Sequence, residues 1–283
     1  MASDPLLQVE DLHVTFHTPK GPVEAVRGVS FQLGQEKLGI VGESGSGKSQ
    51  TGRAILRLTD RRGEVRARTL RFKDTELLSA PPRVLREVRG SGISMILQDP
   101  KYSLNPVMSV GRQISEAFLV HEKTSREEAK RRALEMLEAV RIRDPERVYR
   151  AYPHELSGGM GQRVMIAMMM IPEPEIIIAD EPTSALDVTV SLQVLAILDD
   201  MVSRRGTGLI LISHDLNLVA SFCDRVLIMY AGRIVETCAA DKLDQAQHPY
   251  TRGLLNCLPK IEQRVEPLPT LVRDPAWAEE GPP

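Results

Sequence analysis

The sequence predicts an α/β fold in which helices flank a parallel β-sheet. A strand-like segment at residues 37–41 runs into a glycine-rich turn and then into a helical segment at 46–58. From residue 157 onward, helical and strand-like segments alternate. This alternation is typical of parallel strands joined by crossover helices. The 283 residues are enough to bury a sizeable core.

The first part of the chain is predicted to be rich in β-strands. Apolar residues alternate along residues 6–16 and 23–33, and a Lys-Gly-Pro turn at 20–22 separates the two runs. Alternation returns over residues 64–75, and a short apolar run follows at 95–97. These segments indicate β-strands before and after the strand–turn–helix unit.

Residues 98–156 differ in character and are predicted to form an α-helical insert. Ser125 and Glu128 have the spacing of a capping box, and an apolar helix face follows them to about residue 141. Beyond the insert, we expect helices at 160–170, at 189–204 and from 216, and strands at 176–179, 208–212 and 225–229.

The predicted organisation therefore has four parts. Residues 1–97 form the β subdomain and the first part of the core, 98–156 the helical insert, and 157–240 the rest of the core. Residues 241–283 form a C-terminal arm, because seven of the 19 prolines fall within residues 249–283. This composition is typical of a tail or docking arm and not of an independent domain.

Composition and charge exclude several classes of protein. A 26% charged fraction with 42% hydrophobic residues is that of an ordinary globular chain and excludes wholesale disorder. The net charge of −2 argues against a nucleic-acid partner bound through a strong basic field. No run approaches the roughly 18 apolar residues of a membrane span, and residues 1–10 lack the features of a secretory signal. Three cysteines without CxxC spacing predict neither a disulfide framework nor a zinc site, so we expect a cytoplasmic protein.

Residues 42–49, GESGSGKS, match the P-loop pattern G-x-x-x-x-G-K-[ST]. Glycines allow the backbone N–H groups of such a loop to approach phosphate oxygens, and the following helix N-terminus adds partial positive charge. Lys48 would reach the β- and γ-phosphates, and the Ser49 hydroxyl would coordinate Mg²⁺. The sequence therefore predicts a site for ATP and Mg²⁺.

An apolar run at residues 176–179 ends in Asp180 and Glu181. Paired with the P-loop, this strand end is the expected second half of a nucleotide site. Asp180 would hold Mg²⁺, and Glu181 would accept a proton from the attacking water.

Residues 156–160, LSGGM, precede a predicted helix. Ser157, Gly158 and Gly159 could form an anion-binding helix N-terminus. The alternative is a helix N-cap with a flexible loop.

Taken together, the P-loop, LSGGM, the acidic strand end, residues 184–187 (SALD) and a lone His214 resemble the ATPase subunit of an ATP-binding-cassette (ABC) transporter. A sixth element, Gln98 in LQDP at 97–100, also fits. The resemblance covers residues 6–260. It implies a P-loop NTPase cassette with an antiparallel β subdomain, a RecA-like core and an α-helical insert.

The resemblance also implies residue roles. It assigns catalysis to Glu181, His214 and Gln98, and the metal to Ser49, Gln98 and Asp180. It assigns nucleotide contacts to Phe16, Gly42, Ser44, Gly45, Ser46, Gly47, Lys48, Ser49, Gln50, Ser157, Gly158, Gly159 and Asp187. Phe16 would stack on adenine, with a core strand position as the alternative and His17 as the neighbouring candidate.

In such cassettes, Ser157 and Gly159 would contact the nucleotide bound to a partner's P-loop, and Asp187 would communicate across that interface. We therefore expect a head-to-tail pair of cassettes and a poorly active single chain. The family commonly has Arg or Gln after the signature methionine, whereas this chain has Gly161. We expect modest weakening from this change, because glycine costs up to about 1 kcal/mol in a helix.

Residues 26–31, 97–106 and especially 248–255 (HPYTRGLL) resemble the peptide/nickel importer branch. This resemblance implies uptake of a di- or oligopeptide, nickel or a related solute at the cytoplasmic face of the membrane. The implied partners are a second ABC ATPase subunit, two membrane permease subunits that meet residues 99–105, and indirectly a solute-binding protein. No cysteine follows Cys257, so an iron–sulfur cluster is not expected. The alternative function is an accessory ATPase of a soluble phosphonate-degrading complex.

Overall fold

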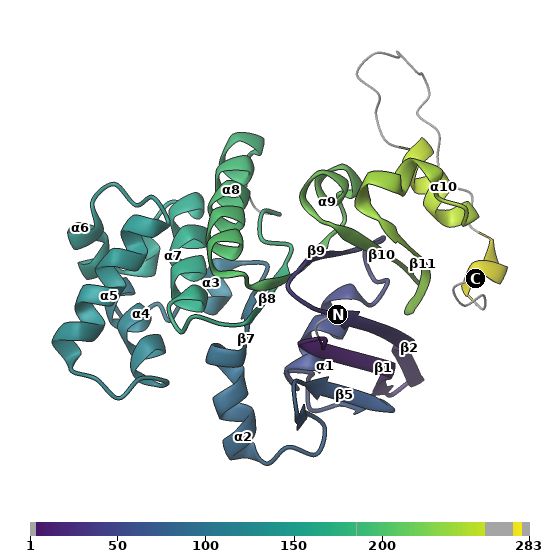
Figure 1. Ribbon diagram of the computed structural model, residues 1–283, viewed down its shortest axis with the longest axis horizontal. Helices are drawn as coiled ribbons and strands as arrows, with labels where there is room; N and C mark the ends of the chain where they lie inside the picture. Colours follow the sequence, from purple (N-terminus) through teal and green to yellow (C-terminus); the bar gives the residue numbers. More distant parts are fainter. Residues whose placement is uncertain (1–3, 185, 258–273, 279–283) are drawn as a thin grey trace. The chain divides into compact units, whose positions relative to one another are not determined.

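The computed structural model describes residues 4–184, 186–257 and 274–278. The chain forms two compact units, which are described separately. Unit 1 comprises Met1–Ala80 and Ile210–Pro283, and unit 2 comprises Pro81–Leu209. The second crossing between the units falls inside strand β9 (Gly208–Ser213), and Figure 1 labels most of the helices and strands.

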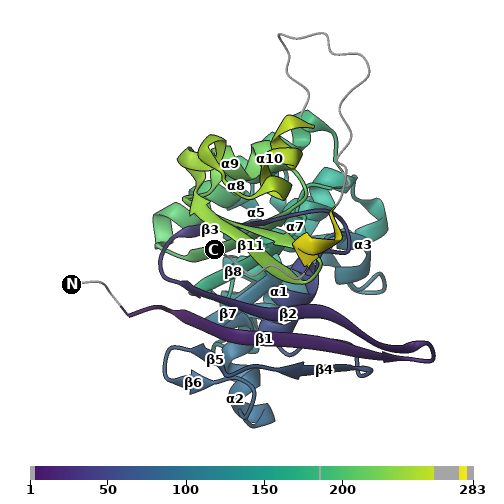
Figure 2. The same cartoon turned by 90° about the vertical axis from the view of Figure 1, so that its right-hand side faces the viewer.

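Unit 1 contains the predicted antiparallel β part. Its strands are β1 (Leu7–Thr18), β2 (Gly21–Leu33), β4 (Gly63–Arg66), β5 (Thr69–Phe72) and β6 (Thr75–Glu76). They pair in the order β2-β1-β5-β6, and β4 also pairs with β1. The period-two apolar pattern explains the sheet, since Leu7 and Val9 are buried, and Leu12 and Val14 are buried again beyond a register shift between Val9 and Leu12. Figure 2 shows β1 and β2 as one long hairpin.

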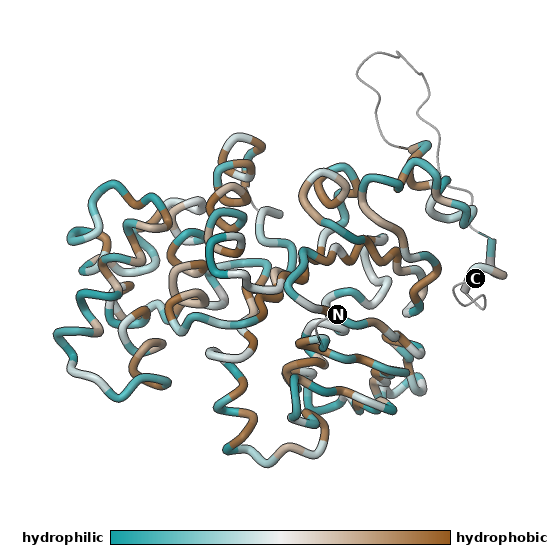
Figure 3. The backbone as a smooth tube through the Cα atoms, viewed as in Figure 1, coloured by the Kyte–Doolittle hydropathy of each residue, from teal (hydrophilic) through white to brown (hydrophobic). Residues whose placement is uncertain are grey.

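The second sheet of unit 1 supports the P-loop. In it, strands β3 (Lys37–Val41), β9, β10 (Arg225–Tyr230) and β11 (Arg233–Ala239) follow the order β11-β10-β3-β9. β10 is parallel to β3 and antiparallel to β11. Nearly every residue of β3 and β9 is buried, as expected for strands covered on both faces. The central strands are brown in Figure 3, whereas the outer helices of unit 2 are largely teal and white.

The helical elements of unit 1 are α1 (Lys48–Ile55), α9 (Leu216–Phe222), α10 (Pro249–Asn256) and the short turns η3 (Ala240–Gln245) and η4 (Pro275–Ala278). α1 is shorter than the predicted 46–58, because the chain before Lys48 belongs to the P-loop. The sequence did not predict β11 or α10. α10 forms inside the expected proline-rich arm because Pro249 takes its first position, where no N–H partner is needed, and His248 caps it.

Unit 2 has a small parallel pair, β7 (Ile93–Ile96) and β8 (Ile176–Asp180), and a group of helices. The helical elements are α2 (Pro82–Glu87), η1 (Val88–Gly92), α3 (Pro100–Ser103), α4 (Val110–Leu119), α5 (Arg126–Ala139), α6 (Pro145–Arg150), η2 (Pro153–Glu155), α7 (Gly158–Met170) and α8 (Val188–Arg205). α7 is central, since it packs against β7, α3, α4, α5 and α8.

Side-chain caps fix the starts of these helices. Ser125 accepts the N–H of Glu128 at 3.1 Å and begins α5, as its spacing predicts. Asp144 and Asp187 cap α6 and α8 in the same way. Gly206, with φ 64°, ends α8 in the left-handed conformation that glycine adopts without strain.

The four predicted segments are not the same as the two units. The predicted helical insert, 98–156, falls within unit 2, whereas the predicted core segment 157–240 is divided between both units. The four-part division therefore stays a prediction. Much of the C-terminal arm, including residues 258–273, lies outside the described residues.

The three cysteines are free. Burial raises the pKa of the Cys223 thiol to about 12, so Cys223 stays protonated and unreactive near neutral pH. Within the described ranges, no helix is long and apolar enough to cross a bilayer.

Candidate nucleotide site

The P-loop of unit 1 connects the end of β3 to the start of α1. A Cβ atom on Gly42 would lie 2.1 Å from the carbonyl oxygen of Met229, and one on Gly47 would lie 2.3 Å from that of Ala25. Gly45 has φ 84° and open space around it. Only glycine satisfies the close approaches at 42 and 47, so these two positions hold the loop against its neighbouring strands.

Lys48 folds back over this loop. Its side chain is buried, and its ammonium group donates to the carbonyl oxygens of Gly42 at 2.7 Å and Glu43 at 2.8 Å. The amide of Ser46 donates to the same Glu43 carbonyl at 3.2 Å. These hydrogen bonds hold the P-loop in a tight turn, with the positive charge of Lys48 next to it.

The loop and the start of α1 fit a chain of phosphate groups. α1 begins after Gly47, which has no side chain to compete for the first amides of the helix. Ser44 and Gly45 are exposed at the tip of the loop, and Ser49 and Gln50 follow in the first turn of α1. Among the described residues, the Oε1 atom of Gln50 is buried and accepts no hydrogen bond, which fits a polar ligand bound at this loop.

Two further predicted residues belong to unit 1. Phe16 is half-buried in β1, opposite Val23 and Gly63, and a Cβ on Gly63 would lie 2.8 Å from its ring. The ring therefore packs over β4 while part of it stays accessible, which is compatible with both roles considered for Phe16. His214 is exposed and directly follows β9.

Unit 2 brings together the predicted acidic strand end and Gln98. Asp180 is the last residue of β8 and is 2% exposed. Glu181 follows it with φ 47°, a left-handed conformation that is strained for a side-chain-bearing residue. The Gln98 amide donates to the Glu181 carboxylate at 3.1 Å. This bond fixes the direction of a carboxylate that the strand end presents, and a fixed carboxylate can act as a base.

The LSGGM motif and the segment around Asp187 are neighbours within unit 2. Ser157 caps α7 by accepting the Met160 N–H at 3.4 Å, so the N-cap alternative is part of the observed structure. Asp187 caps α8 through the Val190 N–H. A Cβ on Gly159 would lie 2.6 Å from the Val190 side chain. The two helix starts therefore approach closely, while Ser157, Gly158 and Asp187 stay exposed.

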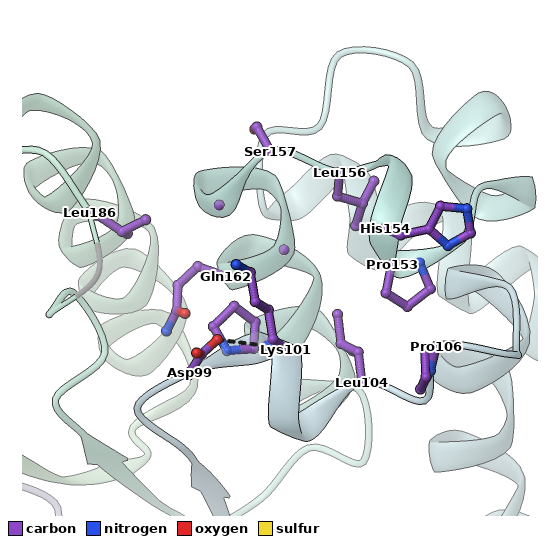
Figure 4. A pocket seen from close by; sticks show the side chains of 13 residues that line it. Asp99, Lys101, Leu104, Pro106, Pro153, His154, Leu156, Ser157, Gln162 and Leu186 are labelled. Atoms are coloured by element: carbon purple, nitrogen blue, oxygen red, sulfur yellow. Dashed lines mark hydrogen bonds between the residues drawn. The ribbon is translucent and has the colours of Figure 1, made fainter.

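Beside LSGGM, unit 2 contains a cavity of about 580 Å³ (Figure 4). It is lined by Asp99, Pro100, Lys101, Leu104, Pro106, Pro153, His154, Leu156, Ser157, Gly158, Gly161, Gln162 and Leu186. Four of the predicted partner-contact residues 99–105 (Asp99, Pro100, Lys101 and Leu104) thus line one wall of the cavity, and the LSGGM motif lines another.

Sequence reasoning missed two glutamines of this region. Gln113 of α4 accepts the Asn105 N–H and donates to the carbonyls of Asn105 and Met108, so it holds the loop whose residues Leu104 and Pro106 line the cavity. Gln162 is 1% exposed, and its Nε2 has no acceptor among the described residues. The sequence offered one clue, a polar glutamine on the apolar face of each helix. A buried polar residue is uncommon without a structural reason.

Comparison with known proteins identifies the family to which these features belong. Residues 26–184, more than half of the chain, match the family described as "ABC transporter". The chain belongs to the ABC transporter family. It is an ATP-binding cassette of that family and an ABC-type ATPase, so the resemblance drawn from its motifs is confirmed. ATP, with Mg²⁺ as the usual ion, is the ligand of such a domain.

Relatives of this ABC cassette include transport proteins. The chain is 46% identical over 275 residues to the oligopeptide transport ATP-binding protein OppD of Escherichia coli, covering 96% of this chain and 81% of that protein. It is 48% identical over 269 residues to OppD of Bacillus subtilis, covering 92% and 74%.

A solved structure shows the same fold. The ATP-binding cassette MJ0796, solved as a dimer in a post-hydrolysis state bound to ADP and Pi, matches with a TM-score of 0.72 and 26% identity. The match covers 83% of this chain and 98% of that one. The predicted fold class, an ABC cassette with an antiparallel β part and helices, is therefore confirmed.

Proposed function

We propose that this chain is the ATP-hydrolysing subunit of an importer that takes up peptides. Two OppD relatives at 46% and 48% identity support peptides over nickel and over a soluble phosphonate-degrading complex. The hydrogen bond between Gln98 and Glu181 at the end of β8 is the observation that best supports particular residues as catalytic.

Each predicted residue then has a role. The P-loop amides and Lys48 bind the phosphates, while Ser49, Asp180 and Gln98 hold Mg²⁺, which neutralises phosphate charge when bound. Gln98 orients Glu181, which accepts the proton of the attacking water. His214 holds the geometry at the γ-phosphate, and Phe16 stacks on adenine.

The site is completed by a second cassette. Ser157, Gly158 and Gly159 contact the nucleotide on the partner's P-loop, and Asp187 lies at the same interface. The exposure of Ser157, Gly158 and Asp187 supports this arrangement, as does the dimeric state of MJ0796. The partner is a different ATPase chain or a second copy of this one.

The remaining partners are two membrane permease subunits. We place their contact at the cavity next to residues 99–105, since it is open, partly apolar and adjacent to Gln98. This contact would hold the chain on the cytoplasmic face of the membrane as a peripheral subunit. A solute-binding protein would deliver the peptide to the permease without touching this chain.

The experiment is uptake by cells that lack the gene and are complemented with variants of the full chain. Glu181→Gln removes the base but keeps the shape of the side chain, so we expect ATP binding to persist. Hydrolysis should fall by about 10²- to 10⁴-fold, and uptake of a labelled tripeptide should be lost. Lys48→Ala should weaken nucleotide binding itself.

Glu116→Gln, on the exposed face of α4, is the matched control. It should support normal uptake. Normal hydrolysis by Glu181→Gln would remove Glu181 as the base. Loss of nickel uptake instead of tripeptide uptake in the deletion strain would contradict the peptide assignment.

A further inference from the structure

One residue of the C-terminal arm contacts the P-loop directly. Tyr250, near the start of α10, is fully buried, and its hydroxyl accepts the N–H of Glu43 at 3.1 Å. The two residues are separated by 207 positions in the sequence. The proline-rich composition of the arm predicts only a tail or docking segment, whereas this contact places part of the arm at the P-loop.

Several hydrogen bonds of the P-loop meet at the backbone of Glu43. Its carbonyl accepts bonds from the Ser46 amide and from the Lys48 ammonium group, as described above. The Tyr250 hydroxyl binds the N–H of the same residue. Glu43 is therefore held at both its backbone N–H and its carbonyl. The backbone conformation at Glu43 thus sets the positions of the loop and of the Lys48 ammonium group.

Tyr250 is itself held firmly. Its own N–H donates to the His248 ring at 3.1 Å, and the His248 N–H donates to the buried Glu236 carboxylate at 3.3 Å. The Tyr250 ring also lies 4.5 Å from the Tyr230 ring, measured between centroids. Since β11 carries Glu236 and β10 carries Tyr230, the hydroxyl is fixed relative to the sheet that supports the P-loop.

The only tryptophan of the chain joins this cluster. Trp277 of η4 lies 6.1 Å from Tyr250, 6.2 Å from Tyr230 and 6.3 Å from His248 between ring centroids. Figure 2 looks toward this side of unit 1, with η4 in front of the sheet and below α10. The aromatic cluster (Tyr230, His248, Tyr250 and Trp277) therefore brings both described parts of the arm, residues 241–257 and 274–278, against the sheet that supports the P-loop.

We propose that Tyr250 is a positioning residue for nucleotide binding, through which the C-terminal arm holds the P-loop in its binding conformation. A loop that is already ordered loses less conformational entropy when it binds a ligand, so its affinity is higher. Tyr250 does not contact the nucleotide. The inference rests on the proposed function, because it takes the P-loop to be the nucleotide site.

The test compares two hydroxyl deletions within the same cluster of the full chain. Tyr250→Phe removes the acceptor of the Glu43 amide and keeps the ring. Tyr230→Phe is the matched control, since within the described part of the chain the Tyr230 hydroxyl forms no hydrogen bond. ADP affinity is measured by equilibrium dialysis, and exchange of the loop amides by hydrogen–deuterium exchange of a peptide that covers Glu43.

Tyr250→Phe should bind ADP about 2- to 10-fold more weakly, which is the effect of losing one ordinary hydrogen bond. Its Glu43 peptide should also exchange faster, while Tyr230→Phe should match the unmodified chain in both measurements. Unchanged Trp277 emission in both variants would show that the aromatic cluster is intact, so that the difference arises from the hydroxyl.

Equal ADP affinity and equal exchange in Tyr250→Phe and Tyr230→Phe would overturn the inference. In that outcome the proposed function would stand, provided that the unmodified chain binds ADP and Lys48→Ala does not. Failure of the unmodified chain to bind ADP would instead contradict the proposed function, and the inference with it.

Discussion

Gly159 and Gly161 occupy the same turn of α7 but have different neighbours. A Cβ on Gly161 would meet the Pro100 ring at 3.5 Å, an ordinary van der Waals contact. A Cβ on Gly159 would lie 2.6 Å from the Val190 side chain, closer than real atoms approach. Position 159 therefore requires glycine for packing between α7 and α8, whereas position 161 does not.

Gly161→Ala should stabilise the chain by up to about 1 kcal/mol, because alanine loses less backbone entropy than glycine in a helix. Gly159→Ala should destabilise it by about 1–3 kcal/mol through overpacking against Val190. Thermal unfolding followed by circular dichroism measures both. A lower melting temperature for Gly161→Ala would show that the space beside Pro100 is not available.

At the scale of elements, polar caps decide where the helices start. α5 begins at Ser125 and α7 at Ser157, and each hydroxyl accepts a backbone N–H three residues further on. The two caps are chemically alike. They differ in surroundings, since Ser157 belongs to LSGGM and lines the cavity, whereas Ser125 starts a helix with a solvated outer face.

This pair separates capping from nucleotide contact. Ser125→Ala and Ser157→Ala should each cost about 1 kcal/mol of stability, because each leaves a helix N–H without its cap. Only Ser157→Ala should also slow ATP hydrolysis in the assembled transporter, through loss of the hydroxyl offered to the partner's nucleotide. Equal hydrolysis by the two variants, at equal stability loss, would restrict Ser157 to capping.

At the scale of the whole molecule, the predicted site residues are distributed over two units. Unit 1 carries the P-loop, Phe16 and His214, and unit 2 carries Gln98, Asp180, Glu181, LSGGM and Asp187. The relatives are transport subunits and a dimeric cassette. The exposure of Ser157, Gly158 and Asp187 is what we expect of an enzyme whose activity depends on assembly with a second cassette.

The isolated chain should therefore hydrolyse ATP slowly, and its rate per mole should rise when the second cassette and the membrane subunits are added. The reason is that, under the proposed function, Ser157 and Gly159 act on a nucleotide bound to another chain. Steady-state hydrolysis, measured alongside sedimentation to establish the oligomeric state, provides the check. Full-rate hydrolysis by a demonstrable monomer would contradict the shared site.

Local patterns were enough to predict many of the elements and motifs. The P-loop and the end of β8 were predictable because short runs of residues set a strand, a glycine turn and a helix. The Ser125 cap was predictable from a spacing of three residues. By contrast, α10 was missed, because the arm was judged by its proline content, although Pro249 is favourable at the first position of a helix. The strand β11, which pairs with β10 just before the arm, was missed as well.

The sequence by itself determined the family, the fold class, the order of the motifs and the residues expected to act on ATP, since each follows from neighbouring residues. Tertiary structure alone decided three contacts: the Gln98 amide on Glu181, the Gln113 amide on the Asn105 carbonyl, and the Tyr250 hydroxyl on the Glu43 N–H. The partners of these side chains come from other segments of the chain, up to 207 residues away. No local pattern specifies such a pairing, because it depends on how strands and helices pack once the core has formed.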